Sequence, residues 1–125
     1  MSKYIFLNST DSENLFPDNN SCDFTVDLER NITGRFLIAL TDFDCENFTE
    51  PLFIFSDIIN TSYINNSYSP VLKLVTKTGE QTNLQYHQAS RNSIQRIRIY
   101  IKDNRLNTPS TNIGRVSCVL KLFAY

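Results

Sequence analysis

The stretch that most constrains the fold is residues 93–103, where isoleucine alternates with charged and polar side chains. Ile97, Ile99 and Ile101 share one parity, and Arg96 and Arg98 lie on the other. Successive side chains of a β-strand point to opposite faces, so the alternation predicts a strand with one apolar and one polar face. A helix would scatter the same isoleucines around its axis, and β-branched side chains favour a pleated sheet.

The closing stretch, residues 115–125, alternates in the same way. One parity is apolar and holds Val116, Cys118, Leu120, Leu122 and Ala124. The other parity mixes Ser117 and Lys121 with Val119, Phe123 and Tyr125. Because this second face is also partly apolar, we expect the strand to be covered on both sides.

The rest of the chain reads as short strands separated by turn-forming residues, without a convincing amphipathic helix. Residues 60–70, rich in Ser, Asn and Tyr, are expected to form an exposed loop. Eight strands are predicted, at residues 3–8, 22–28, 35–42, 52–59, 71–77, 83–88, 93–103 and 115–125. This pattern predicts an all-β fold, an antiparallel eight-stranded sandwich of the single jelly-roll type, forming one domain over residues 1–125.

Strand parity also predicts the core, because apolar residues of one parity face the opposite sheet. The predicted core residues are Phe24, Val26, Leu28, Ile38, Leu40, Ile97, Ile99, Ile101, Cys118, Leu120 and Leu122. A chain of 125 residues with 41% hydrophobic residues can bury such a core without disulfide bonds. The odd count of three cysteines, without framework spacing, favours reduced thiols in a protein made inside a cell.

The sequence carries no recognisable catalytic set, so we expect no enzymatic activity, no cofactor and no metal. His87 is the only histidine, which excludes a two-histidine metal site within one chain, and we interpret it as a surface residue. Asp42 and Asp44 share a parity but lack the further oxygen ligands that a hard cation needs. No apolar run approaches the roughly 20 residues of a membrane-spanning helix.

Charge is divided unevenly along the chain. Residues 1–62 carry eleven Asp and Glu but three Lys and Arg, a net charge of −8, whereas residues 63–125 carry nine Lys and Arg but two acidic residues, a net charge of +7. In the second half, a basic stripe is formed by Arg96, Arg98, Lys102 and Arg105, with Tyr100 among them. A single-stranded nucleic-acid groove uses such a mixture, but the slightly acidic net charge of the chain argues against nucleic acid as a partner.

Sequence blocks along nearly the whole chain, in their order and spacing, carry a family resemblance. The blocks are residues 4–9, 16–19, 24–28, 35–36 with 39–42, 55–59, 70–74, 97–104 and 114–116, with Leu120. They resemble the single jelly-roll, penton-like minor capsid protein of Polinton (Maverick) elements and the related adintoviruses. The resemblance implies a structural subunit of the virion, made in the host cytoplasm or nucleus. It also implies a ring, such as a pentamer, that contacts a major capsid protein.

The uneven charge offers a mechanism for such a ring, because unlike patches of neighbouring subunits can meet head to tail. The acidic candidates for this interface are Asp18, Asp23, Asp27, Asp42 and Asp44, the basic ones are Arg96, Arg98, Lys102 and Arg105, and the apolar anchors are Tyr63 and Tyr68. Two alternatives remain: a β-sandwich recognition module that binds glycan or host protein through its loops, and a nucleic-acid-binding domain that uses the basic stripe.

Overall fold

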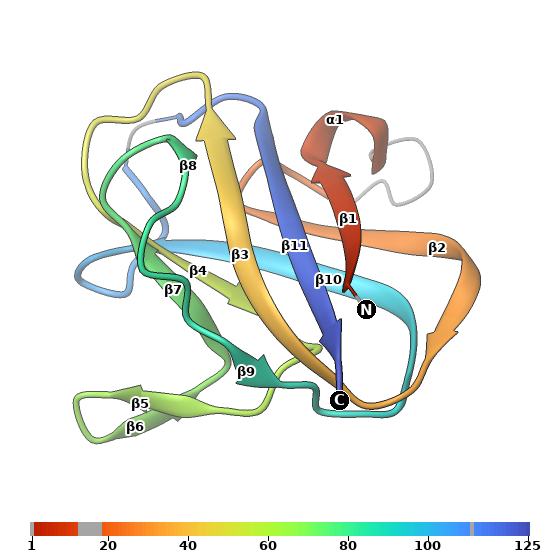
Figure 1. Cartoon of the computed structure of the whole chain (residues 1–125). Coiled ribbons are helices and arrows are strands. Elements are labelled where there is room, and N and C mark those ends of the chain that lie inside the picture. The colour runs from red at the N-terminus through yellow and green to blue at the C-terminus, as the bar shows by residue number, and fades with distance from the viewer. Residues whose placement is uncertain (1, 13–18, 111) are drawn as a thin grey trace.

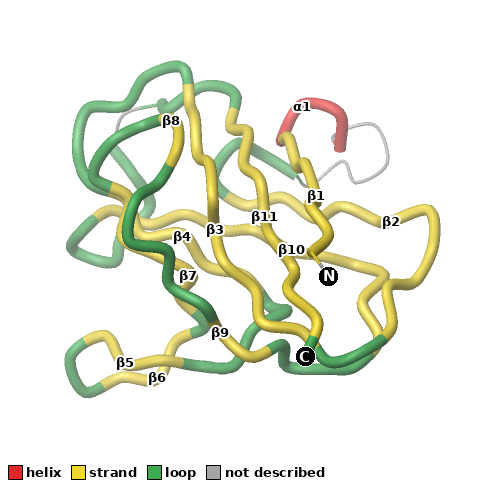
Figure 2. Tube along the Cα trace, in the orientation of Figure 1, coloured by secondary structure: helices red, strands yellow, loops and turns green. Residues whose placement is uncertain are grey.

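The computed structural model describes residues 2–12, 19–110 and 112–125. The described part is all-β and antiparallel, apart from one helical turn, as the sequence predicts (Figures 1 and 2). The elements in chain order are β1 (Ser2–Asn8), α1 (Ser9–Ser12), β2 (Asp23–Thr33), β3 (Phe36–Cys45), β4 (Leu52–Ser56), β5 (Ser62–Ile64), β6 (Ser67–Ser69), β7 (Val71–Val75), β8 (Gly79–Glu80), β9 (His87–Gln88), β10 (Ser93–Asp103) and β11 (Val116–Ala124).

Two antiparallel sheets form a sandwich. The five-stranded sheet has the order β1-β11-β3-β8, with β9 also paired to β3, and the four-stranded sheet has the order β2-β10-β4-β7. Figure 1 shows the first of these in front, with its strands crossing over those of the second. Ser2 of β1 pairs with Phe123 of β11, so the first and last strands lie side by side. Strands β5 and β6 form a separate hairpin.

The alternating stretch forms β10, an inner strand of the four-stranded sheet. Ile97, Ile99 and Ile101 are buried, whereas Arg96 and Arg98 are exposed on the opposite face. β10 pairs with β2 on one side and with β4 on the other, so both edges of its backbone are used in sheet hydrogen bonds. The predicted strand and its two faces are confirmed.

One apolar core lies between the sheets and draws side chains from both. All but two of the predicted core residues are buried. The exceptions, Val26 and Leu28, are half-buried and pack against the core from its side. Both belong to β2, which is an edge strand, and inward side chains of an edge strand meet the opposite sheet only along the rim of the sandwich.

The described residues contain more strands than the eight predicted. The expected loop at residues 60–70 instead contains the hairpin β5–β6, with Asn65 at its tip in the left-handed region (φ 54°), which Asn tolerates. The predicted strand at residues 83–88 shortens to β9, and the short β8 precedes it. Each pairs only two residues with β3. Such short segments lack the length over which alternation is visible in a sequence.

Candidate functional site

The basic stripe follows β10 along the outer face of the four-stranded sheet and continues into the next turn. Antiparallel pairing places Arg96 opposite Asp27 of β2, and Tyr100 opposite Asp23. Two acidic candidates from the first half of the chain therefore share one sheet face with the basic candidates from the second half. The sequence separates these charges by about seventy residues, but the fold brings them into contact.

Both arginine–aspartate pairs are bidentate. Arg96 donates from Nε to Asp27 Oδ1 at 2.7 Å and from Nη2 to Oδ2 at 3.2 Å. Arg98 donates from Nε to Asp23 Oδ1 at 2.9 Å and from Nη2 to Oδ2 at 2.7 Å. The bond from Arg96 lowers the pKa of Asp27, because it stabilises the carboxylate form. The charges of Asp23 and Asp27 are therefore compensated within the subunit, and their role in a contact between subunits stays a prediction.

Tyr100 is enclosed in a column of aromatic and cationic side chains. Its ring stacks on Phe55 with a centroid separation of 4.8 Å, and the Arg98 guanidinium lies 4.5 Å from its centroid. Lys102 Nζ lies 5.5 Å from the ring centroid of Phe55. Burial raises the pKa of Tyr100. Because the ring already has partners, this arrangement disfavours the stacking of nucleic-acid bases on the stripe.

The remaining charged candidates are dispersed. Asp42 is half-buried on β3, and in the strand register it lies opposite Glu80 of β8. Asp44 is exposed nearer the end of β3. Arg105 is exposed in the turn after β10, where its backbone N–H donates to Asp103 Oδ1 at 2.9 Å. Asp18 lies outside the described residues. The described members of the predicted interface are spread over strands of both sheets, the turn after β10 and the β5–β6 hairpin.

The two predicted apolar anchors do lie together. Tyr63 of β5 and Tyr68 of β6 face each other across the hairpin, with ring centroids 4.3 Å apart. The Tyr63 hydroxyl donates to the Tyr68 hydroxyl at 2.7 Å, which raises the pKa of Tyr63. They are 63% and 65% exposed, respectively. Figure 1 shows the hairpin extending away from the two main sheets.

The outer face of the five-stranded sheet carries a second group of exposed aromatic residues. This aromatic face consists of Tyr4, Phe6, Tyr86, Phe123 and Tyr125. The expectation that β11 is covered on both sides is wrong for the described residues, because its outward Phe123 is exposed. Lys121 lies among these rings and donates from Nζ to the Tyr86 hydroxyl at 3.2 Å. An uncovered sheet face of this composition is typical of a contact surface.

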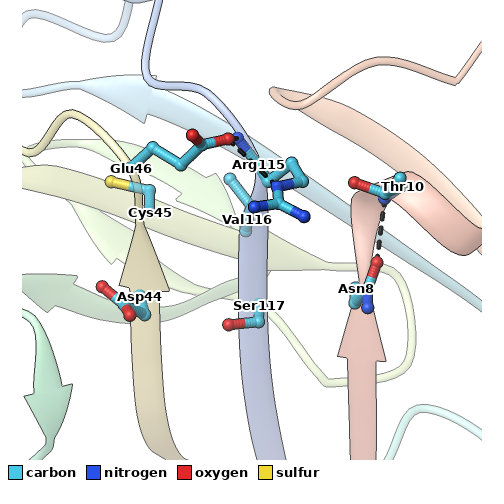
Figure 3. Close-up of a pocket in the computed structure, with 8 residues that line it drawn as sticks. All are labelled: Asn8, Thr10, Asp44, Cys45, Glu46, Arg115, Val116 and Ser117. Carbon is cyan, nitrogen blue, oxygen red and sulfur yellow. Dashed lines mark hydrogen bonds and ion pairs between the residues drawn. The ribbon is translucent and has the colours of Figure 1, made fainter.

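A pocket of about 300 Å³ opens beside this face, at one end of β1, β3 and β11 (Figure 3). It is lined by Asn8, Thr10, Asp44, Cys45, Glu46, Arg115, Val116 and Ser117. Strand register places Asn8 opposite Ser117, and Ser117 opposite Asp44, which gives one polar row across three strands. No sequence motif predicts this pocket, because its residues come from three separate parts of the chain.

One wall of the pocket is an ion pair. Arg115 donates to Glu46 Oε1 from its backbone N–H at 2.8 Å and from Nε at 3.2 Å, and these bonds lower the pKa of Glu46. Burial raises the pKa of the Cys45 thiol, which therefore stays protonated and is a poor nucleophile. The pocket thus offers acidic and basic hydrogen-bonding groups rather than a reactive nucleophile.

The single histidine, the remaining candidate for catalysis or metal binding, contacts the backbone of a neighbouring segment. His87, predicted at the surface, is half-buried, and its Nε2 lies 2.9 Å from the carbonyl oxygen of Leu72. Within residues 2–12, 19–110 and 112–125, no group of three or more His, Cys, Asp or Glu is arranged to hold a metal ion. The described residues also contain no helix with the length and apolar character needed to cross a membrane.

No protein-family model matches the sequence, and no curated protein is significantly similar to it.

Proposed function

We propose that the protein is a non-enzymatic structural subunit, built as a single jelly roll, that self-associates into a ring as a penton-like minor capsid protein of a DNA virus or virus-like element. The strand order supports the jelly-roll part. If β8 and β9 are taken as one edge and the β5–β6 hairpin is set aside, successive strands alternate between the two sheets, and only β4 and β7 are consecutive neighbours in one sheet. A jelly roll combines two Greek keys in this way.

The observation that carries the proposed self-association is the paired tyrosines of the β5–β6 hairpin. Tyr63 and Tyr68 hold each other through a ring contact and a hydroxyl hydrogen bond, so their orientation is fixed before binding. Preorganised tyrosines lose little conformational freedom on association and are enriched at energetically important interface positions. The hairpin is therefore a suitable anchor for a neighbouring subunit.

The aromatic face supplies the complementary surface for this anchor. A hairpin of one subunit that docks on the five-stranded sheet of the next makes a heterologous contact, because each subunit uses two different surfaces. Repeated rotation can close such contacts into a ring, and five copies suit a capsid vertex. Apolar contact provides the affinity between subunits in this arrangement. Two of the predicted basic residues already form ion pairs with two of the predicted acidic residues inside the subunit.

The capsid part of the proposal is supported by the resemblance of the sequence blocks. This part of the proposal comprises assembly into the virion, contact with a major capsid protein, and synthesis in the host cytoplasm or nucleus. The compensated charges of β10 favour this proposal over nucleic-acid binding, because Arg96 and Arg98 already donate to carboxylates.

Analytical ultracentrifugation of the wild type and of a Tyr63→Ala, Tyr68→Ala double variant tests self-association. We expect a concentration-dependent oligomer for the wild type and a shift towards monomer for the variant, with an unchanged thermal midpoint because both rings are exposed. Leu74→Ala combined with Leu106→Ala is the matched control, since it removes exposed apolar side chains from elsewhere on the surface. A wild type that stays monomeric at high concentration, with or without a major capsid protein, would refute the proposal.

The alternative is a β-sandwich recognition module that binds glycan or a host protein. The sequence suggests binding through the loops, but the polar pocket is a better candidate for the binding site. It is concave and has several convergent hydrogen-bonding groups. A monomer that binds a specific ligand would support the recognition module over the ring.

A further inference from the structure

We infer that the pocket at the end of β1, β3 and β11 binds a neutral saccharide, with Asp44 and Ser117 as hydrogen-bonding groups and Phe6 as a stacking surface. The pocket lies on a single subunit. Phe6 also belongs to the aromatic face, so the saccharide and the hairpin of a neighbouring subunit would compete for this ring. A saccharide presents hydroxyl groups that both donate and accept, together with an apolar C–H face. The site offers a counterpart to each of these features.

The floor of the pocket is the polar row Asn8–Ser117–Asp44 (Figure 3). The Asp44 carboxylate and the Ser117 hydroxyl have no hydrogen-bond or ion-pair partner within the described part of the chain, and both residues are exposed. The carboxylate is a pure acceptor with room for two hydroxyl donors, and the serine hydroxyl can donate or accept. Neighbouring hydroxyl groups of one sugar ring match this pair.

Arg115 contributes donors from the pocket wall. Glu46 accepts from its backbone N–H and Nε, which holds the guanidinium in place, while the side chain remains 73% exposed. The Nη groups have no partner among the described residues and are available to a ligand oxygen. Acceptors and donors are thus fixed on two sides of the same pocket.

Phe6 provides the apolar surface. It precedes Asn8 by two residues on β1, so it lies on the same sheet face, about 7 Å further along the strand. The residue is 78% exposed, the most exposed of the large apolar residues described. An uncovered aromatic ring beside a polar row offers a flat surface against which the C–H face of a sugar packs.

The charge of the pocket selects against other small ligands. Asp44 and Glu46 against Arg115 leave a net charge of −1, which disfavours a phosphate or sulfate. An ammonium group, such as a lysine side chain, could pair with Asp44, but it only donates hydrogen bonds and would leave the Arg115 donors unused. A neutral polyhydroxylated ring satisfies both kinds of group.

The test is a titration of the full chain, labelled with ¹⁵N, against a panel of neutral monosaccharides that includes glucose, galactose, mannose and N-acetylglucosamine. We expect at least one sugar to shift the amide signals of Phe6, Asn8, Asp44 and Ser117 with a dissociation constant in the millimolar range. Asp44→Asn should weaken that binding about tenfold, because a hydrogen bond to a charged acceptor is lost. Phe6→Ala should weaken it about fivefold through the lost ring contact.

Matched controls separate the site from general surface effects. Glu29→Gln makes the same type of change at an exposed position of β2, and Phe123→Ala removes an exposed ring from the far end of β11. Both should leave the titration unchanged. The inference is overturned if no sugar shifts these signals, if Asp44→Asn and Phe6→Ala bind like the wild type, or if inorganic phosphate or lysine methyl ester shifts the same signals and the sugars do not.

Discussion

Replacing Ile99 with alanine tests whether the alternation along β10 determines the core. Ile99 has no exposed surface, and it lies at the middle of the four-stranded sheet. Its backbone partners are Phe24 on β2 and Ser56 on β4, both also buried. The change removes three carbon atoms from a site enclosed by two neighbouring strands and by the opposite sheet.

The expected loss of stability follows from this burial. Three buried carbon groups, at ~0.8 kcal/mol each, contribute ~2.4 kcal/mol of lost transfer free energy. A residual cavity of ~50 Å³ adds ~1.2 kcal/mol at ~24 cal/mol per Å³. The total of ~3.6 kcal/mol lies within the ~2–5 kcal/mol range for large-to-alanine changes in cores.

Equilibrium urea unfolding, followed by far-UV circular dichroism, measures this loss as a lower midpoint with an unchanged slope. Ile99→Val is the graded control and should cost ~0.5–1.5 kcal/mol. Arg105→Ala, in the exposed turn, should stay within ~0.5 kcal/mol of the wild type. A cost below ~0.5 kcal/mol for Ile99→Ala, well under the core range, would refute the assignment of this face to the core.

Three further predictions follow from single contacts. Because the hydrogen bond from Arg96 lowers the pKa of Asp27, the pair stabilises the fold above the ordinary aspartate pKa of ~3.9, and this contribution disappears as the pH falls through the lowered pKa. Asp27→Asn should therefore remove part of the acid dependence of unfolding; identical acid titrations of wild type and variant would contradict this. Burial raises the pKa of Cys118 to about 12. A thiol reagent should therefore modify half-buried Cys22 first and Cys118 only after unfolding. Equal modification rates of the two thiols in the folded protein would contradict this prediction. Gly114→Ala should cost about 1–3 kcal/mol, because φ is 74° and the added Cβ would lie 2.6 Å from a glutamate Cβ; an unchanged thermal midpoint would show that the site relaxes.

The sequence by itself determined the all-β class and most of the core. Alternation with a period of two is a local property, so it can be read wherever a strand is long enough. β10 and β11 show this best, because parity alone predicts their inward residues, and all of these except Ala124 at the end of β11 are buried. The same reading could not tell that Val26 is only half-buried, because the edge position of β2 depends on which strands pair.

The candidate site was predicted only in part. Tyr63 and Tyr68 were named from their aromatic character in a polar segment, but their ring contact depends on the hairpin that this segment forms. Short segments such as β5 and β6 carry too few residues to show a period, so their pairing was not visible in the sequence.

Only the tertiary structure decided how the charges and the pocket are arranged. Arg96 and Asp27 are 69 residues apart, and Arg98 and Asp23 are 75 apart, yet strand register makes each pair bidentate. The polar row of Asn8, Ser117 and Asp44 likewise joins three strands from different parts of the chain. Such neighbours are set by the long-range pairing of strands, which depends on the whole core, whereas the periodicity of one strand depends only on its own residues.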